Sequence, residues 1–261
     1  MKLNYNPLIK KHSKSFYWAS FFLTKKCYMK CAYLYDFCRT LDDIVDSREN
    51  IEKKHKLFLK FKQDFKQKKI SNPIIKNMWF IIQNSKINLK VVDDLFNGIE
   101  SDLENPRILR GFDDIYFYAY QVAGTVGLMM AKILNVSHKS AAQGALELGI
   151  AMQLTNIARD VNKDLQLGRM YIRHDFDIIC ETIKKADQFY DSAFNSIKFI
   201  PIKNRFAILV ARRIYREIGY KILKLKNIQE YDLEKRVYVT KWTKFKLTCL
   251  SVGDFIFILV H

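Results

Sequence analysis

The sequence of 261 residues predicts an all-α protein. Apolar residues recur at intervals of three and four along nearly the whole chain, which is the spacing of an amphipathic helix. Strict alternation of apolar and polar residues over six or more positions, which indicates strands, is hard to find. The chain has nine glycines and four prolines, fewer than half of the roughly 30 that average usage gives. Turn-rich β folds and disordered linkers are therefore not expected.

Prolines mark the breaks between the periodic segments, because proline is favoured at the first turn of a helix. Pro73, Pro106 and Pro201 each lie between two such segments. In chain order, we expect helices over residues 15–24, 28–47, 51–69, 73–84, 88–104, 111–134, 138–165, 179–199, 201–226 and 234–248. The chain contains no linker-like stretch and no repeat of fixed period, so residues 1–261 are expected to form a single domain.

Apolar stripes support three of these helices most directly. They consist of Cys31, Leu34, Tyr35, Cys38, Leu41 and Val45 in the second helix, Leu57, Phe58, Phe61 and Phe65 in the third, and Leu146, Ile150, Leu154 and Ile157 in the seventh. A stripe of this kind buries one face of its helix against the rest of a bundle.

The charge is strongly unbalanced, with 44 Lys and Arg against 27 Asp and Glu and a net charge of +17. Nucleic acid, an anionic membrane surface and phosphorylated substrates are the partners that such a balance favours. No helix-turn-helix, zinc-finger or RNP pattern is present, so nucleic acid is not the expected partner. The lysine-rich blocks at residues 53–76 and 198–246 are interpreted as a solvated face that can rest on an anionic membrane.

The expected location is cytoplasmic, with peripheral contact at the inner membrane surface. The five cysteines form no CxxC pair and no zinc-binding spacing, so we expect free thiols in a reducing compartment. The first residues contain no signal-peptide core, and no apolar run approaches the ~18 residues of a membrane span. The aromatic stretch at residues 255–258 is a candidate for contact with a bilayer surface.

Acidic residues gather in two places. In the first, Asp42 and Asp46 are four residues apart and share one face of a helix, beside the core-type residues Leu41 and Val45. Carboxylates at the edge of an apolar face are costly unless a cation or a donor neutralises them. Arg39, one turn before Asp42, is a candidate ion-pair partner.

The second place is a polar ridge formed by Gln153, Asn156, Asp160 and Asp164, at steps of three, four and four residues. Amide and carboxylate oxygens on one ridge suit a hard cation such as Mg²⁺, which prefers a few carboxylates together with substrate phosphates. Arg159 lies beside the ridge, where it can bind phosphate oxygens. Two such ridges facing each other predict a magnesium diphosphate site, whereas a single one would more often be a solvated or ion-paired helix face.

Four segments share a family pattern, in this order: residues 12–17 (HSKSFY), 35–46 (YDFCRTLDDIVD), 118–127 (YAYQVAGTVG) and 153–164 (QLTNIARDVNKD), the last followed by GRMY at 168–171. In these segments, the sequence resembles the squalene/phytoene synthase family of head-to-head prenyl synthases. A weaker resemblance covers residues 214–218 and 236–239. The resemblance implies an isoprenoid synthase-like bundle with a central apolar cavity, lined by a kinked helix at residues 118–127.

The resemblance implies a transferase that joins two allylic prenyl diphosphates through a cyclopropylcarbinyl diphosphate. Bacterial phytoene synthases are the most similar members, so the expected reaction converts two geranylgeranyl diphosphates into phytoene for carotenoid biosynthesis. The near alternative is squalene or dehydrosqualene synthesis from farnesyl diphosphate, and only squalene would require NADPH. A chain elongase would carry a second DDxxD motif in place of the second ridge, and a terpene cyclase a Ser or Thr midway along it.

The resemblance also assigns roles to individual residues. The expected Mg²⁺ ligands, with Mn²⁺ as a substitute, are Asp42, Asp46, Asn156, Asp160 and Asp164. The expected catalytic residues are Asp42, Asp46, Asp160, Asp164, Tyr35 and Arg39. The expected substrate-binding residues are His12, Ser13, Lys14, Ser15, Phe16, Tyr35, Arg39, Val122, Gln153, Arg159, Arg169, Tyr171, Tyr215 and Arg236. Lys163 stands where the family usually has an acidic residue.

A pocket that shields a carbocation must be apolar and aromatic. The candidates to line it are Phe16, Phe21, Phe22, Val122, Val126 and Met129. The alternative from a different class is a basic helical protein that binds nucleic acid or membrane, in which the carboxylates are only structural.

Overall fold

The computed structural model describes residues 7–260 except 105, 137 and 235, and it confirms the all-α prediction. The α-helices are α1 (Leu8–His12), α2 (Lys14–Ser20), α3 (Lys25–Val45), α4 (Ile51–Lys66), α5 (Pro73–Ser85), α6 (Leu89–Glu100), α7 (Phe112–Ala119), α8 (Thr125–Ile133), α9 (Lys139–Arg159), α10 (Val161–Gln166), α11 (Phe176–Phe194), α12 (Ile202–Leu223), α13 (Ile228–Leu233) and α14 (Lys241–Val260). The 3₁₀ segments are η1 (Ser101–Leu103) and η3 (Asn195–Phe199), η2 (Tyr120–Gly124) is a π-helix, and the strands are β1 (Arg107–Ile108) and β2 (Arg169–Met170).

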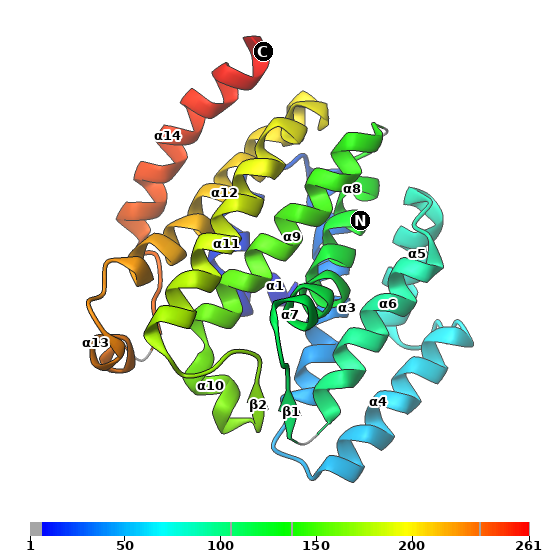
Figure 1. The fold of residues 1–261 in the computed structure, drawn as a ribbon. Coiled ribbons are helices and arrows are strands. Elements are labelled where there is room, and N and C mark those ends of the chain that lie inside the picture. Colours follow the sequence, from blue (N-terminus) through cyan, green and yellow to red (C-terminus); the bar gives the residue numbers. More distant parts are fainter. Residues whose placement is uncertain (1–6, 105, 137, 235, 261) are drawn as a thin grey trace.

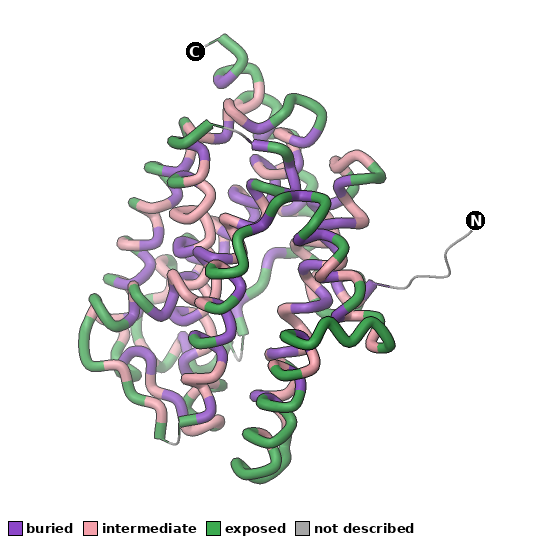
Figure 2. The backbone as a smooth tube through the Cα atoms, turned by 90° about the vertical axis from the view of Figure 1, so that its right-hand side faces the viewer, coloured by how far each residue is buried: buried purple, intermediate pink, exposed green. Residues whose placement is uncertain are grey.

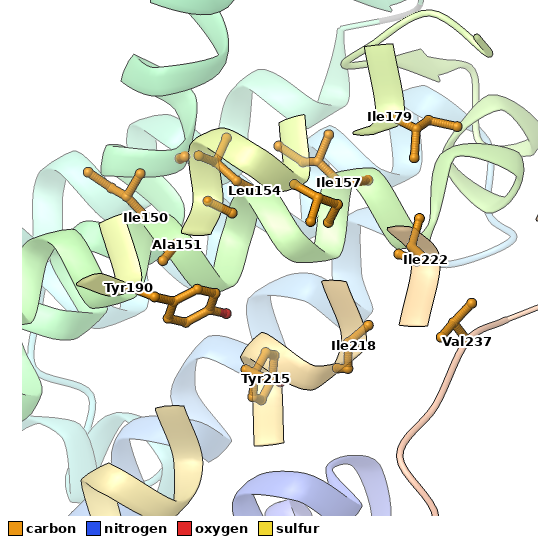
Figure 3. Close-up of a cluster of buried hydrophobic side chains, with 14 of the residues drawn as sticks. Ile150, Ala151, Leu154, Ile157, Ile179, Tyr190, Tyr215, Ile218, Ile222 and Val237 are labelled. Atoms are coloured by element: carbon orange, nitrogen blue, oxygen red, sulfur yellow. The ribbon is translucent and has the colours of Figure 1, made fainter. Parts of the chain in front are cut away.

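Helix α9 lies at the centre of the bundle and packs against α8, α11 and α12 (Figure 1). Helices α3 to α6 form one side of the molecule, and α14 lies at the opposite edge beside α12. Buried residues follow the inner faces of the helices, as the three-to-four-residue spacing predicts (Figure 2). Figure 3 shows the largest cluster, in which Ile150, Leu154 and Ile157 of α9 lie near Tyr215 and Ile218 of α12.

Polar caps explain where several helices begin. The side chains of Thr24, Asn50, Asn88 and Asn227 accept hydrogen bonds from the first backbone N–H groups of α3, α4, α6 and α13, which have no partner inside the helix. Two predicted proline starts are confirmed: Pro73 is in the first turn of α5, and Pro201 directly precedes α12. The third was wrong, because Pro106 precedes strand β1 instead of a helix.

Three expected helices differ from those observed. The helix expected over 111–134 is interrupted by η2, a π-helical segment of the type often found at functional sites. The helix expected over 138–165 ends at Arg159, because Asp160 leaves helical geometry before α10 begins. The helix expected over 234–248 was misplaced: α13 ends at Leu233, and α14 begins at Lys241 and runs to Val260.

The two short strands pair in parallel and fix the loop after α10. The backbone N–H of Arg107 donates to the carbonyl of Gly168, and that of Leu109 donates to the carbonyl of Met170, both at 3.1 Å. Gly168 has a φ of 76°, a left-handed conformation that glycine adopts without strain. The pairing places Arg169 at the C-terminal end of α3, where the first acidic motif lies.

Candidate active site

A cavity of about 310 Å³ runs through the bundle beside α9. Its lining residues on α9 extend from Ala141 to Asn156, a rise of about 22 Å along a helix. Small or aliphatic side chains form the deep end, among them Ala131, Ala141 and Ile200. The cavity agrees with the expected central apolar pocket.

The opposite end of the cavity is polar. Asp42 and Tyr35 of α3 and Gln153 and Asn156 of α9 line it, so the two acidic motifs approach the cavity from facing helices. A second pocket of about 360 Å³ lies at the same ends of α3 and α9, with Arg39 and Arg159 in its wall. Its other charged residues are Lys11, His12, Lys163, Arg236 and Asp160. An apolar chain with an anionic head matches this pair of pockets.

In the first motif, the carboxyl group of Asp42 has a raised pKa. Burial and repulsion from Asp46 raise the pKa of Asp42 to about 7. Arg39 was expected to pair with Asp42, but it pairs instead with Asp43, at 2.5 Å. Both acids are within one turn of Arg39, but Asp42 lines the cavity, whereas Asp43 lies on the exposed surface of α3.

Asp46, in contrast, is held by two cations from the second motif and its loop. Its carboxylate accepts hydrogen bonds from Arg169 Nη1 at 2.7 Å and from Lys163 Nζ at 3.2 Å. Burial alone would raise the pKa of Asp46, but these two cations lower it below its usual value. Lys163, which replaces an acidic residue of the family pattern, thus connects the two acidic motifs.

The second motif shows the same division. Asp160 binds Arg159, and Arg236 donates to it at 3.0 and 3.2 Å; burial opposes the effect, but these cations lower the pKa of Asp160. Burial and the charge of Asp160 raise the pKa of Asp164 to about 7. The motif was expected to lie on one helix, but the break at Asp160 divides it between α9 and α10.

Aromatic side chains form the wall beside the polar end. Phe16 lines the cavity and stacks on Tyr215 with ring centroids 4.7 Å apart, and Tyr35 meets Phe16 edge-on at 6.5 Å. Val122 and Val126 line the cavity as expected. Three other candidates do not line it, namely Phe21, which is 64% exposed, Phe22, which packs on Phe206, and Met129, which is buried among α3–α8. Their apolar character alone did not indicate which face each would occupy.

The remaining predicted substrate residues lie at different distances from the pockets. His12 lines the basic pocket, whereas Ser13 caps α2 through the backbone N–H of Phe16, at 3.3 Å. Lys14 is exposed and Ser15 is half-buried on α2. Arg169 and Tyr171 are buried and line neither pocket. Arg169 instead donates to Asp46 of the first motif, and Tyr171 donates to Asp102.

Asp102 is a half-buried residue beside Tyr171 that no sequence pattern indicated. The hydroxyls of Tyr118 and Tyr171 donate to its two carboxylate oxygens, at 2.8 and 2.6 Å. Burial raises the pKa of Asp102 even though Arg169 and both tyrosines oppose the shift. A single acid in an otherwise ordinary amphipathic segment gave no signal, although Tyr118 lies in one of the matched motifs.

The oxygen-rich residues fit a divalent cation in their chemistry. The side-chain oxygen of Asn156 is buried without a hydrogen-bond partner, and burial together with repulsion from neighbouring carboxylates raises the pKa of Asp42 and of Asp164. Among the residues that the structure describes, no three His, Cys, Asp or Glu side chains are close enough to hold an ion alone. An ion at this position would need additional oxygen ligands, which a diphosphate supplies.

Comparisons with known proteins agree with this geometry. The family model for squalene/phytoene synthase matches residues 9–176. The chain is 26% identical to the chloroplastic phytoene synthase of an Oncidium hybrid cultivar, over 94% of this chain and 66% of that protein. It is 29% identical to the 4,4'-diapophytoene synthase of Staphylococcus haemolyticus, over 93% of each chain. The crystal structure of a dehydrosqualene synthase with a ligand superposes with a TM-score of 0.73, at 26% identity over 94% of this chain and 93% of that one.

Proposed function

Because the chain belongs to the squalene/phytoene synthase family, we propose that it joins two prenyl diphosphates head to head. The proposed reaction converts two geranylgeranyl diphosphates into phytoene through a cyclopropylcarbinyl diphosphate. The observation that carries the proposal is the apolar cavity, whose polar end has a carboxylate from α3 and two amide side chains from the facing α9 and adjoins a basic pocket. This arrangement supports binding an isoprenoid chain and its diphosphate at the same time.

The chemistry requires charge separation without water. Departure of an allylic diphosphate leaves a carbocation in the cavity and negative charge on the leaving group. The apolar walls exclude water, and the aromatic ring of Phe16, which lines the cavity, offers negative potential to the cation. Arg39 and Arg159 line the pocket that would hold the leaving diphosphate.

The ion pairs support a role for the arginines as exchangeable partners. Arg159 and Arg236 neutralise Asp160, and Arg169 and Lys163 neutralise Asp46. We infer that Arg159 and Arg236 turn toward phosphate oxygens when the diphosphate binds, which frees Asp160 as a metal ligand. Among the described residues, no ion pair holds Asp42 or Asp164, and burial raises the pKa of both carboxyls.

The residues that would hold Mg²⁺, or Mn²⁺ in its place, are Asp42, Asp46, Asn156, Asp160 and Asp164. When bound, the metal neutralises charge on the diphosphate. The chain itself positions these oxygens at the ends of α3 and α9 and surrounds them with basic side chains.

The length of the cavity supports the longer substrate. Small side chains at the deep end, including Ala131 and Ala141, leave room for the tail of a geranylgeranyl chain. The second candidate is a farnesyl substrate giving dehydrosqualene, or squalene with NADPH. It is favoured by the match to the diapophytoene synthase, which covers 93% of both chains.

One assay tests the proposal and separates the two candidates. The purified protein is incubated with geranylgeranyl or farnesyl diphosphate and Mg²⁺, with and without NADPH, and apolar products are extracted. We expect phytoene from geranylgeranyl diphosphate without NADPH, formed faster than any product from farnesyl diphosphate. Faster turnover of farnesyl diphosphate would establish the second candidate, and no apolar product from either substrate would refute the synthase function.

A further inference from the structure

Helix α14 presents an apolar face to solvent. Six exposed residues, Trp242, Phe245, Val252, Ile256, Leu259 and Val260, fall within about 100° of the helix circumference. Trp242 is 84% exposed, Val260 76%, and Phe245 and Ile256 56% each. We call these six residues the α14 apolar stripe. Exposed patches of this kind on soluble proteins mark interaction sites.

The position of the stripe is fixed by the opposite face of α14, which packs on the bundle. Leu247, Ser251 and Ile258 are buried there, and Trp18 Nε1 of α2 donates to Thr248 Oγ1 at 3.0 Å. Asp254 forms a two-point ion pair with Arg213 of α12. The stripe is therefore directed away from the core, at the edge of the molecule where Figure 1 shows α14.

The charges around the stripe select an anionic partner. Asp254 is the only acid in α14, and Arg213 neutralises it. The exposed charged residues of α14 are Lys241 and Lys246. A second copy of this chain would bring the same lysines and another +17 charge to the contact, which repels. A bilayer surface with anionic lipids offers both apolar depth and negative charge.

We propose that the α14 apolar stripe docks on an anionic lipid bilayer, with the helix lying in the plane of the interface. Trp242 would lie at the level of the headgroups, where its ring is favoured, and Lys241 and Lys246 would reach the lipid phosphates. None of the helices within the described part of the chain is long and apolar enough to cross a membrane. The contact is therefore peripheral.

The contact also relates to the cavity, a step that rests on the proposed function. Ile197 and Ile200 line the deep end of the cavity and belong to the same buried cluster as Ile258 of α14. The deep end is thus covered by the C-terminal half of the docked helix. An apolar product would leave the protein where lipid is the adjacent phase.

Vesicle flotation without substrate tests the docking surface. We expect the full chain to bind vesicles of phosphatidylcholine with phosphatidylglycerol at least about tenfold more tightly than vesicles of phosphatidylcholine alone. Brominated lipid should quench the fluorescence of Trp242, and the Trp242→Phe variant should show no such quenching. The double variant Phe245→Asp, Ile256→Asp should lose binding at least about tenfold, and Lys241→Gln with Lys246→Gln should reduce the preference for anionic lipid.

The matched control changes two comparably exposed apolar residues elsewhere. Leu59→Asp with Ile70→Asp adds the same charge at the basic block around α4, where the side chains are 51% and 67% exposed, and it should bind as the wild type does. Loss of binding in this control alone would assign the membrane contact to α4 and overturn the proposal. Wild-type protein that ignores both vesicles, or that forms dimers which the α14 variant dissolves, would also overturn it. Activity in detergent reports on the proposed function separately.

Discussion

At the scale of residues, the four aspartates of the two motifs form two kinds of site. Asp46 and Asp160 are neutralised by basic side chains, whereas burial leaves Asp42 and Asp164 with pKa values raised to about 7. Lys163 helps to form the first kind of site, because it pairs with Asp46. The family pattern has an acidic residue at this position. Each kind makes an opposite contribution to the stability of the folded protein.

We predict that Asp42→Asn and Asp160→Asn both reduce turnover at least about 100-fold but change stability in opposite directions. The folded pKa of Asp42 lies above its unfolded value, so its contribution to stability is lost as pH rises through about 7. Asp42→Asn should therefore raise the free energy of unfolding at pH 8 by about 1–2 kcal/mol, which is less than the full pKa shift implies because solvent screens part of the charge. Near pH 4, the variant should gain no stability.

Asp160 has the reverse sign, because its lowered pKa makes the ionised form stabilising above its unfolded pKa. Asp160→Asn should therefore destabilise the protein at pH 8. Chemical denaturation at both pH values, with circular dichroism to confirm helix content, measures these changes. Asp93→Asn on the exposed surface of α6 is the control and should stay within about 0.5 kcal/mol. Equal stability changes for the two motif variants would contradict the division.

At the scale of elements, α9 approaches η2 closely enough that only glycine fits at their crossing. A Cβ atom on Gly149 would lie 2.2 Å from the carbonyl oxygen of Ala123, and one on Gly127 of α8 would lie 2.0 Å from that of Ala145. Both contacts involve backbone atoms of the helices that line the cavity. The π-helical segment and the small residues together determine the width of this wall.

We predict that Gly149→Ala destabilises the protein by about 1–3 kcal/mol, the cost of overpacking a core. The matched control is Gly253→Ala in the interior of α14, where a Cβ meets nothing within 4 Å. That variant should stabilise the protein by about 0.5–1 kcal/mol, because alanine favours helix. Thermal unfolding of the two variants gives the comparison, and stabilisation by Gly149→Ala would show that the crossing is looser than described.

At the scale of the whole molecule, the candidate site is assembled from both sides of the bundle. Helix α3 contributes the first motif, and α9, α10 and the loop containing Arg169 contribute the second. The two motifs are brought together only in the folded protein, so a ligand that bridges them binds the folded state and not the unfolded chain. Ligand binding should therefore raise the free energy of unfolding of the whole protein.

We predict that Mg²⁺ and inorganic pyrophosphate together raise the melting temperature by more than the sum of their separate effects. Within the described part of the chain, no three carboxylates are grouped closely enough to hold Mg²⁺ by themselves. Pyrophosphate without the metal is repelled by the negatively charged aspartates of the two motifs. At 100 times the dissociation constant, joint binding adds about 2.7 kcal/mol. Differential scanning fluorimetry at constant ionic strength measures this, and the full shift with pyrophosphate alone would contradict the role given to the metal.

The amino-acid pattern alone was enough to predict that the chain is helical, where most helices lie, and which carboxylates and amides form the two motifs. These properties follow from spacing along one helix, which depends only on residues a few positions apart. The helix boundaries failed where local pattern was weak, as at residues 234–248, and where geometry changed within a periodic segment, as at Asp160.

Which charges meet, and which apolar residues line the cavity, depends on the three-dimensional packing of the helices. Asp46 pairs with Lys163 and Arg169, more than 100 positions away along the chain, and Phe16 lines the cavity whereas Phe21 faces solvent. The direction of the α14 apolar stripe, which faces solvent, likewise depends on how α14 packs against the bundle. The physical reason is that periodicity defines the faces of a helix, but the face that is buried and the partner that it meets depend on the packing of distant elements.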